Sequence, residues 1–455
     1  MARTGYTVTQ QAYESIPDRR GGETMKLNAR HIAYTGLFAA LLLVLYLLLV
    51  FSAAIPNSAI IKNMLDSAEY IANEEPYVFS DDGKHQNITD NLADQMWLNI
   101  GWHMGSGNPF VSALDTRYYD GEKYGPPVGL FLSVAQGHKA NADYTRYWHG
   151  TAGIMRVLHL FTDIHGIKFL GMVCLVLLLW RTLRVLFRSG HWDLGLCLLV
   201  SLLLVQVWNL HLSVEYQPCF LICFGLCPAF LRLESRGDFY LNLLAIVSGT
   251  MTAFFDFLTT ETITILIPLI LVIAIRSREC RLESPRRVLE MLLRCGICWA
   301  LAYLGTFAVK WGAVSLATGE NHFLSAFDSV GQRVNGVVTE GNTRKMPGML
   351  TAIVSNLTVL FEGTSRTEYR IVISNLFVIV ILIFVVYRMY QVRQILRPGT
   401  VFILMLGSLV LLRYSILANH SYMHSFFTYR ALASTIFAVL VAMLINLQPR
   451  KKGGR

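Results

Sequence analysis

The side chains with the clearest chemical potential in this chain are acids, histidines and cations at the ends of long apolar segments. The stretch FFDFLTTET places Asp256 and Glu261 in a short break between two apolar runs. An ionisable group inside a bilayer costs roughly 2.5–3.5 kcal/mol on insertion scales, so it usually has a partner or a functional role there. Further groups of this kind end other apolar runs: Lys310, Arg413, His420, His424 and Arg430.

Together, these residue types suit the recognition of a phosphate and the activation of a nucleophile. A guanidinium group stays charged and binds phosphate oxygens through two parallel hydrogen bonds. A carboxylate can act as a general base, or it can bind a divalent cation that bridges phosphate oxygens. Each group alone could be solvated at the membrane interface, whereas the whole set would line a cavity if the helix ends converge. For Glu261, a second explanation is that it stabilises the N-terminus of the following helix.

A second set of candidate residues lies in the long polar segment over 54–165. Asp90 and Asp94 are four residues apart, so a helix would present both on one face. Asp90 is also a good N-cap candidate, which would give it a structural role. His149 follows two aromatic residues that could instead anchor the chain at a membrane interface. The segment therefore offers both chemical and structural explanations for its polar residues.

The composition predicts that a membrane protein positions these residues. Of the 455 residues, 54% are hydrophobic and 15% are charged, and the mean hydropathy is +0.45. Soluble domains carry nearer a quarter charged residues. A membrane-spanning helix needs roughly 17–25 apolar residues, and about ten segments meet or approach this length. The expected spans are 33–53, 168–187, 192–210, 217–232, 239–257, 261–277, 291–313, 371–389, 400–417 and 429–447.

The basic residues predict which side of the membrane each loop occupies. The net charge of +9 comes from Lys and Arg in short segments at one set of helix ends, as the positive-inside rule predicts. The sequence has no basic face interleaved with aromatic residues, which argues against nucleic-acid binding. We therefore expect a cytoplasmic segment over 1–32, a first span over 33–53 and a basic cytoplasmic tail over 448–455.

The remaining segments predict an all-α protein with one large loop domain. Residues 54–165 are expected to fold on the extracytoplasmic side, partly as amphipathic helices lying on the membrane, one of them over 144–161. Residues 166–447 are expected to form the transmembrane bundle, with an extracytoplasmic loop over 315–370. Within that loop, 346–361 is apolar but short, so it could span the membrane or re-enter it. The lack of an internal repeat argues against a secondary transporter.

This arrangement resembles the GT-C class of integral membrane glycosyltransferases, which includes the protein O-mannosyltransferases and the lipid A aminoarabinose transferase. The shared features are a cytoplasmic N-terminus, a first span, a large first external loop with amphipathic helices and acids, and many further spans. The resemblance implies transfer of a sugar from a polyprenyl-phosphate donor to a glycan, lipid or protein acceptor on the extracytoplasmic side. It also implies a bacterial plasma membrane and a role in cell-envelope glycan synthesis.

The resemblance further implies that an acid of the first external loop acts as the catalytic base or binds a metal. The expected catalytic acid is Asp94 or Asp90, with Asp256 as a second acid in the cavity. In an inverting displacement, this acid would deprotonate the acceptor while cations neutralise the departing polyprenyl phosphate. No cofactor is required on this mechanism, and a divalent cation (Mg or Mn) is optional. The expected substrate-binding residues are Arg430, Arg413, His424, His420, Lys310, His149 and Glu261.

Two other functions are compatible with the same charges. A transporter or flippase for a lipid-linked or anionic substrate would use them to line an outer cavity, but it should place functional charges near the middle of the membrane. A polyprenyl-linked glycan polymerase or ligase would be expected to carry its large loop late in the chain. The sequence places the charges at one face and the large loop early, which favours the glycosyltransferase hypothesis.

Overall fold

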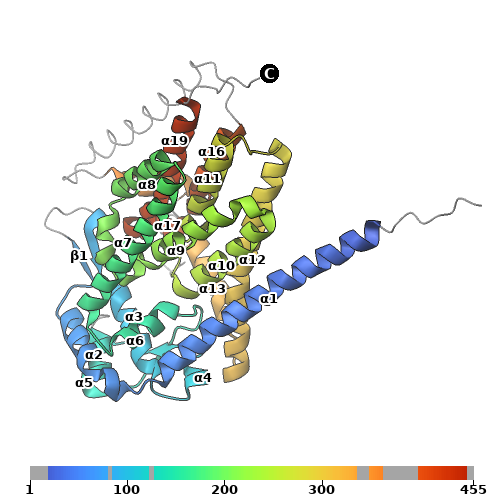
Figure 1. Ribbon diagram of the computed structural model, residues 1–455. Helices are drawn as coiled ribbons and strands as arrows, with labels where there is room; N and C mark the ends of the chain where they lie inside the picture. The colour runs from blue at the N-terminus through green and yellow to red at the C-terminus, as the bar shows by residue number, and fades with distance from the viewer. Residues whose placement is uncertain (1–18, 80–84, 122–127, 336–347, 362–397, 448–455) are drawn as a thin grey trace, which may run out of the picture.

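Helices long and apolar enough to cross a membrane dominate the structure and make the chain an integral membrane protein of the all-α class (Figure 1). The computed structural model describes residues 19–79, 85–121, 128–335, 348–361 and 398–447. Within these ranges the 7 crossing segments are Ala29–Ala54, Ile164–Arg188, Val214–Arg236, Asp238–Phe255, Pro285–Thr318, Gly399–Ile416 and Ser425–Asn446. They are built on α1 (Arg19–Ala54), α7 (Ile164–Arg188), α9 (Pro218–Leu233), α10 (Asp238–Phe255), α12 (Pro285–Thr318), α16 (Pro398–Ile416) and α19 (Leu432–Leu447).

The described residues do not confirm the expected count of about ten spans. One expected span, 371–389, lies outside the described residues. Helix α8 (Trp192–Leu204) has only 13 residues, and the chain turns soon after it, where Gln206 adopts a left-handed conformation with φ of 53°. Helix α11 (Ile263–Arg278) has 16 residues and is about 24 Å long, shorter than a hydrocarbon core of about 30 Å.

Helix α11 forms the centre of the bundle. Every residue from Ile263 to Ile275 is buried, and α9, α16 and α19 pack around the helix. A helix that is hydrophobic on all sides is stable only where other elements cover it completely. Because α11 is enclosed, the loop that leads into it from α10 is drawn inside the protein as well.

Residues 57–158 form a separate layer at one end of the bundle (Figure 1). Its core packs Trp97, Leu98 and Trp148 against buried residues of α1 and α2. Two small antiparallel sheets join the helices, with Tyr77 paired to Asp90 and Arg117 paired to Asp143. The elements are α2 (Asn57–Ala72), β1 (Tyr77–Phe79), η1 (His85–Asn87), β2 (Ile88–Asp90), α3 (Asn91–Met104), α4 (Pro109–Ser112), β3 (Arg117–Tyr118), α5 (Val128–Gln136), β4 (Ala142–Asp143) and α6 (Gly150–Leu158).

The helix expected to lie on the membrane over 144–161 is shorter and more buried than the sequence predicted. It is α6, which has 9 residues and packs against α1 and α3. The Arg156 guanidinium on α6 donates hydrogen bonds to the carbonyl oxygens of Ser52 at 3.0 Å, Gly101 at 2.9 Å and Ile55. The amphipathic pattern therefore reflects a helix that ties α1 to the layer, because its polar residues bind the exposed carbonyls of other helix ends.

The apolar segment over 346–361 contains α14 (Met349–Leu360) within its described part. This helix has 12 residues and is about 18 Å long, which is too short for a span. It packs against α16, α17 and α18. The remaining described elements of the bundle are η2 (Val207–His211), η3 (Val214–Tyr216), η4 (Glu234–Arg236), α13 (His322–Asn335), α17 (Ala418–Met423), α18 (Ser425–Thr428) and η5 (Tyr429–Ala431).

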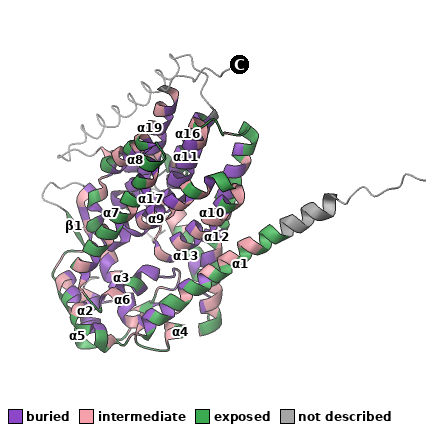
Figure 2. Ribbon diagram, in the orientation of Figure 1, coloured by how far each residue is buried: buried purple, intermediate pink, exposed green. Residues whose placement is uncertain are grey.

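Large apolar side chains remain exposed on the outer helices (Figure 2). Phe51 on α1, Trp180 on α7 and Leu301 on α12 are 63%, 62% and 66% exposed. Exposed apolar surface of this extent marks a membrane-facing or partner-facing side. The outer faces of α1, α7 and α12 therefore contact the lipid bilayer.

Candidate functional site

The loop between α10 and α11 is held inside the protein in a strained conformation. Leu258 has φ of 68°, in the left-handed region that non-glycine residues rarely adopt. Its carbonyl oxygen accepts hydrogen bonds from Arg413 Nη2 at 2.6 Å and from His420 Nε2 at 2.9 Å. Backbone strain of this kind persists only where the surroundings enforce it, and it is concentrated at functional sites.

Asp256 begins this loop, and its carboxylate is buried. Helix α10 ends at Phe255, and the Asp256 carboxylate accepts hydrogen bonds from the Thr259 backbone N at 3.0 Å and from Thr259 Oγ1 at 2.5 Å. Burial, together with the nearby Glu261 carboxylate, raises the pKa of Asp256 to about 6. A carboxyl group with a pKa near neutrality is suited to accept a proton at physiological pH.

Glu261 forms a bidentate ion pair with Arg413 on α16. Arg413 Nε lies 2.7 Å from Glu261 Oε1, and Arg413 Nη2 lies 3.2 Å from Glu261 Oε2. Both side chains are only 6% exposed, and Arg413 Nη1 also donates to Ser421 Oγ at 3.0 Å. The sequence suggested that Glu261 stabilises the N-terminus of the following helix. In the structure its carboxylate instead forms a tertiary contact, because the ion pair holds the loop to α16.

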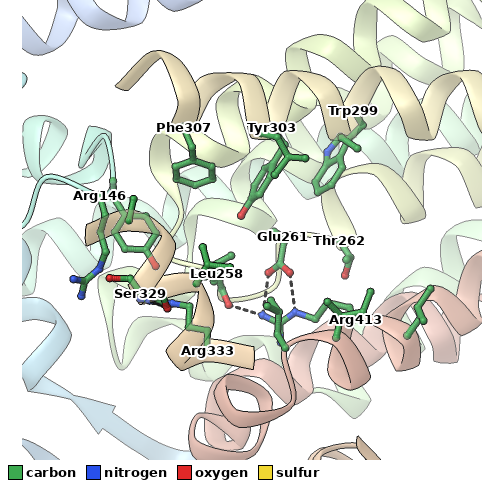
Figure 3. A pocket seen from close by; sticks show the side chains of 18 of the residues that line it. Arg146, Leu258, Glu261, Thr262, Trp299, Tyr303, Phe307, Ser329, Arg333 and Arg413 are labelled. Atoms are coloured by element: carbon green, nitrogen blue, oxygen red, sulfur yellow. Dashed lines mark hydrogen bonds and ion pairs between the residues drawn. The ribbon is translucent and has the colours of Figure 1, made fainter. Parts of the chain in front are cut away.

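A pocket of about 460 Å³ opens beside this ion pair (Figure 3). Trp299, Tyr303 and Phe307 of α12 face the Glu261–Arg413 pair across it. Helices α12, α13 and α16 supply mostly apolar walls. The polar and aromatic lining residues are Arg146, Tyr147, Glu261, Thr262, Trp299, Tyr303, Phe307, Trp311, Ser329, Arg333 and Arg413. The pocket thus joins a long apolar surface to a small number of charged groups.

Four polar atoms at this pocket are buried without a hydrogen-bond partner among the described residues. They are Arg146 Nε, Thr262 Oγ1, Tyr303 Oη and Arg333 Nε. The two arginines are held by rings, because the Arg146 guanidinium lies 4.1 Å from the Tyr144 ring and that of Arg333 lies 5.5 Å from the Tyr147 ring. Buried polar groups are rarely left unpaired in proteins, so four around one pocket indicate a polar ligand.

The acids of the loop domain lie in a different cluster, where their charges are already paired. Asp94 is fully buried, and its Oδ1 accepts hydrogen bonds from Ser213 Oγ and from the Val214 N, each at 2.9 Å. Lys168 Nζ of α7 lies 2.7 Å from Asp94 Oδ2. These contacts attach α3 to α7 and to the segment before α9. Asp94 therefore has a clear structural role in the described contacts.

Asp90 is the N-cap of α3, which is one of the two roles that the sequence suggested for it. Its carboxylate accepts a hydrogen bond from the Ala93 N at 2.8 Å, and it also hydrogen-bonds the Glu215 carboxyl group. Burial raises the pKa of Asp90 to about 7. The buried Asp90 carboxyl group therefore binds a proton more readily than an exposed aspartate does.

Arg430 belongs to the same cluster and does not line the pocket. It donates from Nη1 to the Phe426 carbonyl at 3.2 Å and from Nη2 to the Gln86 carbonyl at 3.0 Å. Its guanidinium carbon lies 4.6 Å from the Tyr216 ring and 5.0 Å from the Tyr429 ring. Arg430 thereby joins the loop domain to the start of α19, in place of the expected contact with a shared outer cavity.

Lys310 and His149 are buried beside the loop domain. Lys310 Nζ on α12 donates to the Leu114 carbonyl at 2.5 Å and lies 5.4 Å from the Trp148 ring. His149 Nε2 donates to the Tyr144 carbonyl at 2.6 Å, and its ring packs edge-on against Trp97 and Phe257. Burial lowers the pKa of His149 well below its usual range, so it is neutral at pH 7.

His420 and His424, two of the expected substrate-binding residues, also have lowered pKa values. Burial, aided by His424 and Arg413, lowers the pKa of His420 well below its usual range. Burial lowers the pKa of His424 to about 4. His420 contributes to the site by holding the Leu258 carbonyl, and His424 stacks on Phe427 away from the pocket.

The structure therefore divides the expected single cavity into two regions. Glu261 and Arg413 line the pocket. Asp256 is hydrogen-bonded within the α10–α11 loop, and His420 donates a hydrogen bond to that loop. The sequence did not indicate Arg146, Tyr147, Tyr303 or Arg333, which also line it. Arg146 lies between Tyr144 and Tyr147, and this aromatic spacing around a cation was the one available signal.

Within the part of the chain that the structure describes, no three His, Cys, Asp or Glu side chains are grouped to hold a metal ion. The chain was finally compared with known proteins. No protein-family model, no curated protein and no solved structure matches it.

Proposed function

We propose that this protein is a membrane glycosyltransferase that moves a sugar from a polyprenyl-phosphate donor to a hydroxyl acceptor. The topological resemblance to the GT-C class supports this function, and the pocket between α12, α13 and α16 supports it independently. The proposed setting is a bacterial plasma membrane, with both termini cytoplasmic and the pocket opening toward the extracytoplasmic side. The loop domain over 57–158 then lies on that same side.

The observation that carries the proposal is the composition of the pocket wall. Trp299, Phe307 and Trp311 provide an apolar surface on α12, which itself faces lipid, and a polyprenyl chain can lie along such a surface. At the same pocket, the Nε atoms of Arg146 and Arg333 have no hydrogen-bond partner among the described residues. Arg413 is neutralised by Glu261, so Arg146 and Arg333 are the cations that we assign to the phosphate.

We assign the role of catalytic base to Asp256. Asp94 is paired with Lys168 and Asp90 caps α3, whereas Asp256 receives its hydrogen bonds from Thr259 within the loop that borders the pocket. The acceptor hydroxyl reaches the Asp256 carboxylate by replacing the Thr259 hydroxyl as its hydrogen-bond donor. This assignment does not include the divalent cation, which is optional in the mechanism that the resemblance implies.

The proposed reaction is an inverting displacement at the anomeric carbon. The acceptor oxygen forms a bond to that carbon while its proton passes to Asp256. The bond from the anomeric carbon to the phosphate oxygen breaks, and the electron pair leaves with the polyprenyl phosphate. Arg146 and Arg333 stabilise the charge that develops on the phosphate, which is the electrostatic contribution expected of preorganised cations.

Transfer from a labelled donor tests the proposal. Purified protein is incubated with polyprenyl-phosphate sugars that carry a radiolabelled sugar, and label leaving the lipid is measured. We expect release by the wild type and a strong decrease for the double variant Arg146→Gln, Arg333→Gln. The double variant Arg286→Gln, Arg287→Gln removes two exposed charges at the far end of α12 and should retain activity.

Two results would count against the proposal. If folded protein releases no sugar from any donor, the function is wrong. If intact labelled lipid instead crosses the bilayer of reconstituted vesicles without losing its sugar, the flippase alternative is favoured.

A further inference from the structure

A second cavity lies on another face of α12, between α12, α1 and α10. Its volume is about 910 Å³, compared with about 460 Å³ for the pocket described above. The residues of α12 that line it, such as Leu301 and Ala302, differ from those that line the first pocket. Its polar lining residues are Arg30, His31, Tyr34, Thr35, Arg236, Asp238, Asn242 and Arg294.

Three arginines converge on this cavity from three different elements. Arg30 belongs to α1, Arg236 to η4 and Arg294 to α12, and all three are exposed. Among the described residues, Arg30 and Arg236 have no carboxylate partner, and the nearest acid to Arg294 is Glu290 at 3.9 Å.

The single acid in the lining does not offset these charges. Asp238 lies 3.3 Å from Arg276, so its charge is compensated by another residue. The cavity is therefore electropositive, and an anion is the ligand that its charge favours.

The walls of the cavity are apolar and face the membrane. Phe239 stacks on Tyr34 with ring centroids 5.5 Å apart, and Ile297 and Leu301 are 56% and 66% exposed. The Tyr34 hydroxyl accepts a hydrogen bond from Asn242 Nδ2 at 3.0 Å, which leaves its own proton to donate. A soluble anion would use the arginines but would leave these exposed apolar walls unexplained.

Charged and apolar residues follow the same order along the three helices. Arg30 precedes Phe38 on α1, Arg236 precedes Ile246 of α10, and Arg294 precedes Leu301 on α12. Helix α10 packs along both α1 and α12, and its contacts with α12 advance from Asn242 with Cys295 to Gly249 with Trp299. Parallel helices with this order place the cations at one end of the cavity and the apolar residues about 10–15 Å further along, at 1.5 Å per residue.

We propose that this cavity binds a phospholipid with an anionic headgroup. The lipid phosphate is held between Arg30, Arg236 and Arg294, with a further hydrogen bond from Tyr34. The acyl chains lie along Ile297 and Leu301. A lipid bound in this way packs between α1 and α12 and strengthens the attachment of α1, whose apolar segment is only 33% buried within the protein.

Native mass spectrometry of the full chain tests this proposal. The protein is released from nanodiscs that contain phosphatidylglycerol or phosphatidylcholine, and the retained lipids are counted. We expect preferential retention of one phosphatidylglycerol by the wild type. The triple variant Arg30→Gln, Arg236→Gln, Arg294→Gln should lower this retention by at least about tenfold, since each basic residue near an anionic lipid contributes measurably to binding.

The controls distinguish specific lipid binding in this cavity from nonspecific attraction between arginines and anionic lipids. The triple variant Arg181→Gln, Arg184→Gln, Arg188→Gln removes equal charge from a different arginine cluster, on α7, and should retain the lipid. A second variant, Thr35→Trp, fills the cavity without changing its charge and should also lower retention. Equal loss in the two arginine variants, or full retention by Thr35→Trp, would overturn the proposal.

Two further outcomes concern the nature of the ligand. Equal retention of phosphatidylcholine by the wild type would show that the headgroup charge is not recognised, and it would contradict the proposal. Displacement of phosphatidylglycerol by millimolar inorganic phosphate would assign the arginines to a free anion and would also contradict it. Retention that survives inorganic phosphate supports a lipid.

Discussion

The pocket beside the α10–α11 loop and the acid cluster beneath α3 contain similar residue types in opposite electrostatic situations. In the acid cluster, Asp94 is paired with Lys168, and Asp90 accepts a hydrogen bond from the Ala93 N. At the pocket, Arg146 and Arg333 each keep a nitrogen without a hydrogen-bond partner among the described residues. The acid cluster also contains buried atoms without such a partner, Glu215 Oε1 and Arg430 Nε, but its charged groups mainly hold elements together, whereas the pocket places its unpartnered atoms beside an apolar cavity.

This difference shows that burial of a charge is a poor guide to function by itself. Asp94 and Arg430 are among the most buried ionisable residues of the described chain, and their contacts join the loop domain to the bundle. Arg146 and Arg333 are only partly buried. What distinguishes them is their place: Arg430 Nε also lacks a hydrogen-bond partner among the described residues, but only Arg146 and Arg333 line the apolar pocket.

Loss of the Asp256 carboxylate is expected to have the largest effect on activity. Asp256→Asn keeps the size of the side chain but removes its ability to accept a proton, so transfer should fall by about 10²- to 10⁴-fold. For the wild type, kcat/KM should fall as the pH drops through about 6, because Asp256 becomes protonated there. Sugar release from labelled donor across pH 5–8 measures both effects.

The control for this experiment is Glu283→Gln, which removes an exposed acid far from the pocket. Near-normal turnover in Asp256→Asn would remove Asp256 from the role of base.

Disruption of the Asp94–Lys168 pair is expected to affect stability most. Asp94→Ala leaves Lys168 buried without its counter-charge, which should lower the free energy of unfolding by about 3–5 kcal/mol. Thermal unfolding in detergent measures this loss. In contrast, Asp256→Asn should unfold close to the wild-type temperature.

A compensating double variant sharpens the distinction. Asp94→Leu with Lys168→Met replaces the pair by apolar side chains and should recover much of the lost stability. If this folded double variant also lacks activity, Asp94 takes part in the reaction and the proposed division between the two regions is wrong.

Single arginine variants at the pocket should affect substrate binding more than stability. Arg146→Gln and Arg333→Gln each remove a charge-assisted contact to phosphate, so KM for the donor should rise by about 10- to 100-fold. The folded state should lose little, because neither arginine has a carboxylate partner within the described residues. Equal KM values in these variants and in the wild type would separate the arginines from donor recognition.

The Asp90–Glu215 pair predicts a smaller, pH-dependent effect on stability. Asp90 has a folded-state pKa of about 7, above the ordinary value of 3.8, so the folded protein holds a proton that the unfolded chain releases. Stability should therefore rise as the pH is lowered from 8 toward 5, by up to about 3 kcal/mol. Asp90→Asn keeps an N-cap and removes the titration, so thermal unfolding of this variant should depend less on pH.

Several features of the fold could be predicted from residue types alone. The apolar runs at 33–53, 168–187, 239–257 and 291–313 become helices α1, α7, α10 and α12, because hydrocarbon leaves a helix as the main way to satisfy the backbone. Helix α11 shows why hydropathy alone does not give the number of spans: it is apolar because protein covers it, and hydropathy does not distinguish a protein partner from lipid.

The sequence by itself determined a helical membrane protein and a short acidic break after the apolar run at 239–257, and it offered an N-cap as one of two roles for Asp90, because each depends on local composition or spacing. Only the tertiary structure decided which charges meet. Arg413 is 152 residues from Glu261, and Lys168 is 74 positions from Asp94, so neither pair follows from spacing. The pocket likewise depends on how α12, α13 and α16 pack, and this packing leaves the Nε atoms of Arg146 and Arg333 without a hydrogen-bond partner among the described residues.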